Sequence, residues 1–230
     1  RRGLLLWMSH PAWPSMAFCT YDWYGDTPAS YYACRKACEP LHIQWNPVDE
    51  CVEVVNYYAG DRTGLKAVAT VYDMHGAVVS TQVRMLDARE DTTTPLFSAD
   101  RPGPVCFLRL ELFDGEQCVS HNDYVMPAQE DNLQALNDLP EATLQVRELP
   151  STFTNRNLLC HVAVSNTSDT PALMLHLVAR RSDGSRILPN PWSDNYIHLM
   201  PGEERVLDYW IPDDEPDVKI EINGFNCAAR

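Results

Sequence analysis

The first 25 residues of the chain hold the side chains best suited to recognising a ligand. Trp7, His10 and Trp13 lie within seven positions of one another, Pro11 and Pro14 flank Trp13, and Tyr21–Tyr24 adds three more aromatic rings. A flat aromatic ring can stack on the apolar face of a pyranose, and loops rich in aromatic residues and proline are typical of sugar-binding rims. This loop is therefore a candidate sugar-binding surface.

The elements around this loop are unusual for a β protein. The short apolar run Leu4–Met8, bounded by proline, predicts a buried strand that ends in an irregular loop. Residues 27–39 then predict a helix, and the remainder of the chain predicts strands. A single strand and helix before an all-β chain would make sense as the last β/α unit of a larger barrel, so we expect the natural polypeptide to extend upstream of residue 1.

The same residues resemble a known family. The motifs that carry the resemblance are W-x5-WP from Trp7, D-x-YG from Asp22 and P-x2-YY-A from Pro28. Their order resembles the eighth strand and helix of the catalytic barrel in glycoside hydrolase family 2, most of all in its exo-β-glucosaminidase and β-mannosidase branch. Residues 134–140 and 193–203 resemble the immunoglobulin-like domains that follow the barrel in that branch.

The resemblance implies substrate-binding roles for a few residues. Trp7 would line the sugar subsite at the end of barrel strand eight; the alternative is a core tryptophan under the barrel. His10 stands where many relatives have Asn or Asp, so it either hydrogen-bonds a sugar hydroxyl or fixes the loop. The loop 188–196 either contributes Trp192 and Asp194 to substrate binding or holds its own shape through local Asx and Ser hydrogen bonds.

The acidic residues of this chain do not predict a catalytic pair. A retaining glycosidase uses two carboxyl groups about 5–5.5 Å apart, and in the resembling family they lie on barrel strands well before the last one. The acidic clusters at residues 90–91, 203–204 and 213–215 lie beside turns and predict solvated surface. Asp22 is better explained as a group that fixes its loop. We therefore expect no catalytic residue here and an inactive fragment of a parent glycoside hydrolase that releases terminal β-linked glucosamine or mannose.

Composition and charge argue against nucleic acid and anionic membranes as partners of this chain. The 230 residues are 45% hydrophobic, enough for a substantial core, and their formal net charge is −14. A surface this acidic repels nucleic acid and anionic membranes. The expected partners are a carbohydrate substrate and the chain's own N-terminal catalytic domain, with secretion or a periplasmic location.

The eight cysteines do not predict a disulfide framework or a metal site. Cys34 and Cys38 are four apart on the predicted helix, where a bridge would be strained. Cys106 and Cys118 flank a predicted hairpin turn at residues 114–115, which would place Phe113 opposite Glu116 and keep the two thiols apart. We expect mostly free cysteines in the core. His161 and His176 have no companion at metal-ligand spacing, so no metal or cofactor is expected.

Repeated short strands with turns between them define the rest of the chain. They predict a mainly β fold of two immunoglobulin-like antiparallel β-sandwiches preceded by a strand-loop-helix remnant of a (β/α)8 barrel. The predicted boundaries are residues 1–39 for the remnant, 40–127 for the first sandwich, 128–140 for a linker with one helical turn, and 141–230 for the second sandwich.

Two other functions compete with the enzyme fragment. Paired sandwiches could form a non-catalytic module that binds a polysaccharide or a protein, which exposed aromatic rows on one sheet face would favour. A cell-surface adhesin would predict disulfides or D-x-D-x-D calcium loops, and the sequence has no such loop. The aromatic residues gather instead in the N-terminal segment, which favours the enzyme fragment.

Overall fold

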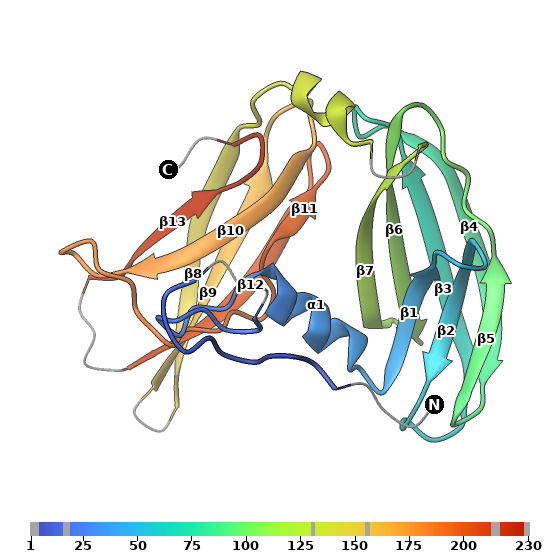
Figure 1. Cartoon of the computed structure of the whole chain (residues 1–230), viewed down its shortest axis with the longest axis horizontal. Coiled ribbons are helices and arrows are strands. Elements are labelled where there is room, and N and C mark those ends of the chain that lie inside the picture. The colour runs from blue at the N-terminus through green and yellow to red at the C-terminus, as the bar shows by residue number, and fades with distance from the viewer. Residues whose placement is uncertain (1–4, 16–18, 130–131, 155–156, 213–216, 228–230) are drawn as a thin grey trace. The chain divides into compact units, whose positions relative to one another are not determined.

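The computed structural model describes residues 5–15, 19–129, 132–154, 157–212 and 217–227. These residues form thirteen strands, one α-helix and one short 3-10 helix, and every strand pairing among them is antiparallel (Figure 1). The predicted mainly β fold is confirmed. Contacts divide the chain into unit 1, comprising Arg1–Cys34 and Pro140–Arg230, and unit 2, comprising Arg35–Leu139. The domain boundaries given above stay predictions.

The helix predicted near the N-terminus is present as α1 (Ala29–Ala37). It begins directly after Pro28, because proline lacks an N–H group that the first helical turn would leave unpaired. The strand predicted at Leu4–Met8 is wrong for its described part: residues 5–8 form no strand, and Leu5 and Trp7 are 99% and 83% exposed. An isolated extended segment has no neighbour for its backbone hydrogen bonds, and none of the described strands pairs with it.

Unit 2 contains two antiparallel sheets. One has the order β1-β2-β5 and the other the order β4-β3-β6-β7. The strands are β1 (Leu41–Asn46), β2 (Cys51–Asn56), β3 (Arg62–Tyr72), β4 (Val78–Ala88), β5 (Thr92–Phe97), β6 (Val105–Asp114) and β7 (Gln117–Pro127). Alternate side chains of both sheets meet in one buried cluster, which includes Ile43, Val54, Leu65, Leu108 and Leu110. This is the arrangement that the period-two hydrophobic pattern of these strands predicts.

Strand β5 is missing from the strands that the sequence predicts. Its run Thr92–Phe97 contains Pro95, and a proline within such a run argues against a strand because it donates no backbone hydrogen bond. The structure places β5 at the edge of its sheet, paired only with β2. An edge strand tolerates proline, so the local signal against a strand was misleading.

The β6–β7 hairpin corrects a predicted register. Gly115, with a φ of +61°, is the first of two turn residues, so Asp114 faces Gln117 and Phe113 faces Cys118 rather than Glu116. Glycine takes this position because the favoured two-residue hairpin turns need a positive φ there. The expected separation of the two cysteines is confirmed, since Cys106 faces Met126. Cys19, Cys106 and Cys160 are buried as expected, whereas Cys38 and Cys118 are exposed.

Unit 1 also contains two antiparallel sheets, of order β12-β9-β8 and β11-β10-β13. The strands are β8 (Leu144–Thr154), β9 (Asn157–Asn166), β10 (Ala172–Arg180), β11 (Ile197–Leu199), β12 (Glu204–Pro212) and β13 (Lys219–Asn223). One buried cluster joins both sheets to Tyr32 of α1, and it includes Val162, Leu175, Leu177 and Leu207. The helical turn predicted at residues 132–139 is confirmed as the 3-10 helix η1 (Gln134–Asp138), which belongs to unit 2.

Each of the two units has a buried asparagine at the end of one of its strands. In unit 2, Asn56 at the end of β2 donates its amide hydrogens to the carbonyls of Gly60, at 2.8 Å, and Ala88, at 3.1 Å. In unit 1, Asn166 at the end of β9 donates to the carbonyl of Thr170, also four residues on, at 2.8 Å, and to that of Leu199 at 3.0 Å. Each amide ties a turn to a distant strand. The two units therefore have a common structural device.

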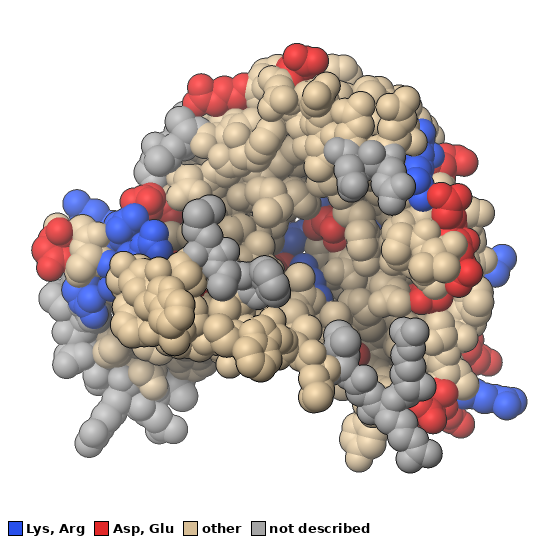
Figure 2. Space-filling model, viewed as in Figure 1, with Lys and Arg blue, Asp and Glu red and all other residues tan. Residues whose placement is uncertain are grey.

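The charge of the chain is visible on its surface. Acidic side chains lie in several groups over the face drawn in Figure 2, and basic ones gather with acidic ones over the end of β10. This distribution agrees with the formal net charge of −14. Among the described helices, none has the length and apolar character to cross a membrane.

Candidate functional site

The predicted sugar-binding residues of the N-terminal loop, Trp7 and His10, are exposed. Trp7 is 83% exposed, and the exposed His10 ring lies 6.0 Å, between ring centres, from that of Trp23. Trp13 of the same loop is also open to solvent, at 68% exposed. Leu5 and Leu6 are also exposed. The loop thus presents a run of apolar and aromatic side chains to solvent, and the substrate-binding roles of Trp7 and His10 stay predictions.

The chain between this loop and α1 is held in place by its own side chains. Both backbone N–H groups that follow the turn, those of Tyr24 and Asp26, donate to the Asp22 carboxylate at 2.8 Å. This confirms Asp22 as a loop-fixing group. Asp26 in turn forms a 2.6 Å ion pair with Arg186, which lies in the loop after β10. The segment is therefore anchored to the body of unit 1 (Figure 1).

Tyr32 of α1 forms the centre of that anchor. Its side chain is 3% exposed and packs in the unit 1 core. Its hydroxyl lies 2.9 Å from the Thr27 hydroxyl and accepts a hydrogen bond from the backbone N–H of Trp192 at 3.2 Å. Burial raises the pKa of Tyr32 above its ordinary value, which keeps the hydroxyl protonated. The helix and the loop 188–196 are thus joined through one buried phenol.

The loop 188–196 holds its own shape. Trp192 is 3% exposed and stacks on Tyr209, with 4.4 Å between ring centres. Asp194 accepts the backbone N–H of Asn195 at 2.9 Å and lies 3.7 Å from Arg205. The Asn195 amide pairs with both backbone groups of Leu177, as a neighbouring strand would. These contacts support the alternative of a self-supporting loop over direct substrate contact by Trp192 and Asp194.

One polar residue of this loop escaped the sequence reasoning. Asn190 is 5% exposed, and neither its amide oxygen nor its amide nitrogen has a hydrogen-bond partner among the described residues. A buried polar group usually finds a partner, because leaving it unpaired costs about 1–3 kcal/mol. The prolines on both sides of Asn190 predict that the chain forms no regular strand here. Nothing in the local sequence indicated that the Asn190 side chain would be buried.

A Ser-His-Glu cluster in unit 2 resembles a nucleophilic site but has the wrong geometry. The Ser120 hydroxyl donates to the Glu39 carboxylate at 2.6 Å, while it lies 3.5 Å from Nδ1 of His42. A serine nucleophile must give its proton to the histidine at about 2.6–3.2 Å. Ser120 is also only 3% exposed and accepts the backbone N–H of Ile43. These contacts fasten β1 to β7.

A pocket of about 340 Å³ lies between β8, β9 and β12 in unit 1. Cys160 and Tyr209 lie in its wall, and burial together with the neighbouring Cys160 thiol raises the pKa of Tyr209. His161, which the sequence left without a companion, forms a 2.6 Å contact through Nδ1 with Asp208 on the adjacent strand. Across the described ranges, no three His, Cys, Asp or Glu side chains come together in a way that could hold a metal ion.

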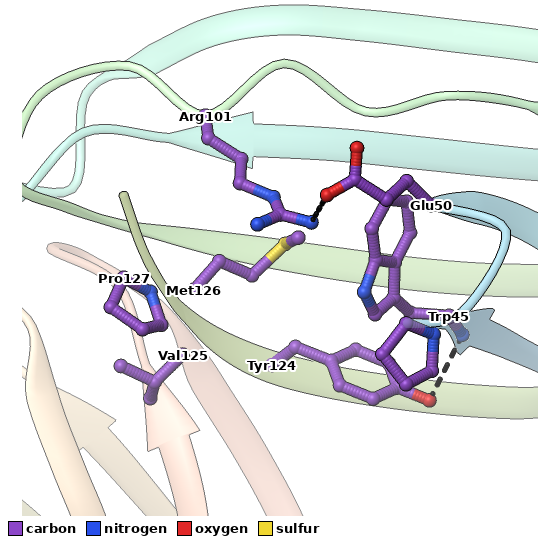
Figure 3. Close-up of a pocket in the computed structure, with 8 residues that line it drawn as sticks. Trp45, Glu50, Arg101, Tyr124, Val125, Met126 and Pro127 are labelled. Atoms are coloured by element: carbon purple, nitrogen blue, oxygen red, sulfur yellow. Dashed lines mark hydrogen bonds and ion pairs between the residues drawn. The ribbon is translucent and has the colours of Figure 1, made fainter. Parts of the chain in front are cut away.

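A second pocket, of about 420 Å³, lies in unit 2 at the turn between β1 and β2 (Figure 3). The guanidinium of Arg101 lies 5.3 Å from the centre of the Trp45 ring and donates to the Glu50 carboxylate at 2.8 Å. The backbone N–H of Trp45 donates to the Tyr124 hydroxyl at 3.1 Å. The remaining lining residues are Pro47, Val125, Met126 and Pro127. Trp45 lies in a strand pattern that predicts a core or interdomain anchor, and nothing in the local sequence links it to residues 50 and 101.

Comparison with known proteins finds a family model that matches part of the chain. The model described as the Exo-beta-D-glucosaminidase Ig-fold domain matches residues 122–227. These matched residues, called the Ig-fold domain below after that model, include β8 to β13, the Asn166 corner and the loop 188–196.

The similarity to curated proteins extends beyond this Ig-fold domain to 99% of the chain. Exo-beta-D-glucosaminidases from Arthroderma benhamiae and Amycolatopsis orientalis are 26% and 27% identical to it, and a mannosylglycoprotein endo-beta-mannosidase from Lilium longiflorum is 22% identical. The matches span 28%, 25% and 31% of those proteins, so the chain corresponds to about a quarter to a third of their length.

A solved structure has the same fold. The exo-chitosanase CsxA of Amycolatopsis orientalis superimposes with a TM-score of 0.86 at 23% sequence identity, over 96% of this chain and 30% of that one. A likeness at this identity shows the fold alone. The chain is thus similar, over nearly its whole length, to exo-beta-D-glucosaminidases.

Proposed function

We propose that this chain is a C-terminal accessory part of a retaining, exo-acting β-glycosidase that releases terminal β-linked glucosamine, with mannose as the second candidate sugar. The observation that carries the proposal is the similarity to exo-beta-D-glucosaminidases over 99% of the chain, within only about a quarter of their length. In this proposal the catalytic carboxylates belong to another part of the enzyme, and residues 1–230 support it.

The proposal gives each part of the chain a structural task. Residues 1–39 are the end of the catalytic barrel, and unit 2 and the Ig-fold domain are two immunoglobulin-like sandwiches that buttress it. The exposed Leu5, Leu6 and Trp7 support this assignment, because adjacent apolar side chains this open to solvent mark a surface that another part of a protein covers. The covering part would be the N-terminal catalytic domain, and Trp7 and His10 would then face the sugar.

The anchor around Tyr32 supports a buttressing role. Through Tyr32 and Asp26, the segment before and within α1 is joined to the loops after β10 and before β11. A rigid connection of this kind would transmit the position of the Ig-fold domain to the exposed N-terminal loop. We further propose that the enzyme is secreted or periplasmic and that it needs no cofactor.

The test combines activity with gene structure. The purified chain is assayed with nitrophenyl β-glucosaminide and nitrophenyl β-mannoside, and we expect no turnover of either. The reading frame upstream of residue 1 is then sequenced, and we expect it to continue into a region similar to the remainder of an exo-β-glucosaminidase. Clear hydrolysis by the purified chain, or a natural start codon at residue 1, would overturn the proposal.

A further inference from the structure

The unit 2 pocket belongs to neither the N-terminal loop nor the Ig-fold loops that the proposed function uses. We propose that it binds one pyranose unit of a β-linked oligosaccharide. The pocket defines the class of ligand; the choice of glucosamine as the preferred sugar rests on the proposed function.

The size and walls of the pocket fit a sugar ring. Its volume of about 420 Å³ lies within the range of about 300–1,000 Å³ that is usual for small-molecule sites. Trp45 and Tyr124 supply aromatic surface, and Pro47 and Pro127 add rigid apolar rings. The C–H face of a pyranose packs against such walls, as it does against an indole. Rigid walls also reduce the entropy lost on binding.

The polar groups of the pocket match hydroxyls that are both donors and acceptors. Glu50 and Arg101 both line the pocket and form a 2.8 Å ion pair (Figure 3). The carboxylate can accept from one sugar hydroxyl while the guanidinium donates to the next one on the ring. A ligand that offered only donors or only acceptors would satisfy one of the two. Adjacent hydroxyls of a pyranose satisfy both.

The exposure of the two charges favours an amino sugar. The Glu50 side chain is 67% exposed, whereas that of Arg101 is 31% exposed and lies over the Trp45 ring. An incoming ligand therefore meets the carboxylate first. An ammonium group on the sugar would pair with Glu50, and the net charge of −14 would raise the local concentration of a cationic oligomer.

The experiment is calorimetric titration of the whole 230-residue chain with three oligosaccharides: a glucosamine pentamer, an N-acetylglucosamine pentamer and cellopentaose. We expect the glucosamine pentamer to bind most tightly. Glu50→Gln should weaken its binding about tenfold, which corresponds to the loss of one charge-assisted contact, and should affect cellopentaose less. Trp45→Ala should weaken all three oligosaccharides, with thermal unfolding used to verify that the variant is folded.

Matched controls separate this site from other exposed groups. Glu90→Gln removes an exposed carboxylate elsewhere in unit 2, and Trp210→Ala removes an exposed indole from β12 of unit 1; neither should change the affinity. No binding of any of the three oligosaccharides, unchanged affinity in folded Glu50→Gln and Trp45→Ala, or loss of binding in folded Trp210→Ala would overturn the proposal. These results leave the buttressing function standing, because that function requires no sugar contact in unit 2.

Discussion

Replacing Asn166 should test the buried corner that both units use. This side chain is 1% exposed and makes four hydrogen bonds: its amide donates to the Thr170 and Leu199 carbonyls and its oxygen accepts from the backbone N–H and the hydroxyl of Ser168. Asn166→Ala removes all four. The Ser168 groups are only half-buried and regain water, whereas the two carbonyls belong to residues that are buried.

The cost follows mainly from the Leu199 carbonyl, because the Thr170 carbonyl still has the Ser168 hydroxyl 3.3 Å away as a donor. A buried acceptor without a partner costs about 1–3 kcal/mol, so the unfolding free energy of unit 1 should fall by about 2 kcal/mol. This is a substantial part of the roughly 5–15 kcal/mol that stabilises a typical domain. The corresponding decrease in Tm is about 6 °C, taking roughly 2–4 °C per kcal/mol for a protein of this size. Asn166→Asp should be at least as damaging, because its carboxylate would face the same carbonyl oxygens.

The assay is thermal and urea unfolding of the whole chain, followed by circular dichroism and tryptophan fluorescence. Asn157→Ala, an exposed asparagine on the same strand, is the matched control and should change Tm by less than 2 °C, since surface substitutions cost about 0.5 kcal/mol or less. Asn56→Ala should destabilise unit 2 to a similar extent, because its amide makes equivalent bonds. A decrease in Asn166→Ala no larger than in Asn157→Ala would refute the reasoning.

Two further predictions concern Tyr32 and His176. Tyr32→Phe should lower the unfolding free energy by about 1–2 kcal/mol in urea titrations, because the Thr27 hydroxyl and the Trp192 N–H lose their buried partner. The control Tyr24→Phe, at an exposed tyrosine of the same segment, should not change the unfolding free energy, and equal effects of the two substitutions would contradict the anchor. Burial lowers the pKa of His176 from its ordinary value near 6.5, so the folded state binds fewer protons than the unfolded one. Its contribution to stability is complete above about pH 6.5 and decreases as the pH falls below that value, a dependence that His176→Gln should reduce when unfolding is measured from pH 7 to pH 5.

Local sequence patterns predicted most of the strands correctly. Leu158 to Val164 and Leu173 to Leu177 show the alternation of a half-buried strand, and β9 and β10 lie there. The helix after Pro28 was also predicted. These elements succeed because periodicity and turn residues act over a few positions, and the tertiary structure agrees with them. The edge strand β5 failed because its proline is tolerated only by virtue of a place in the sheet that no local pattern encodes.

The candidate sites show the same difference between residues that are close in sequence and residues that are distant in sequence. The exposed aromatic loop was recognisable because its residues are close in the chain, and the loop 188–196 stood out by its turn formers. The pocket of Trp45, Glu50 and Arg101 was not, since Arg101 reaches Glu50 from 51 positions away. Burial of Trp192 against Tyr209 likewise depends on β12, which comes later in the chain.

The amino-acid order is thus enough to establish the mainly β class, the family likeness and the acidic character of the surface, because each depends on short-range patterns or on composition. Only the folded chain decides which carboxylates meet a guanidinium, which asparagines become buried and which tryptophans remain open to solvent. Those outcomes depend on hydrogen bonds and packing between segments that are distant in sequence, and their partners are brought together only when the sheets assemble.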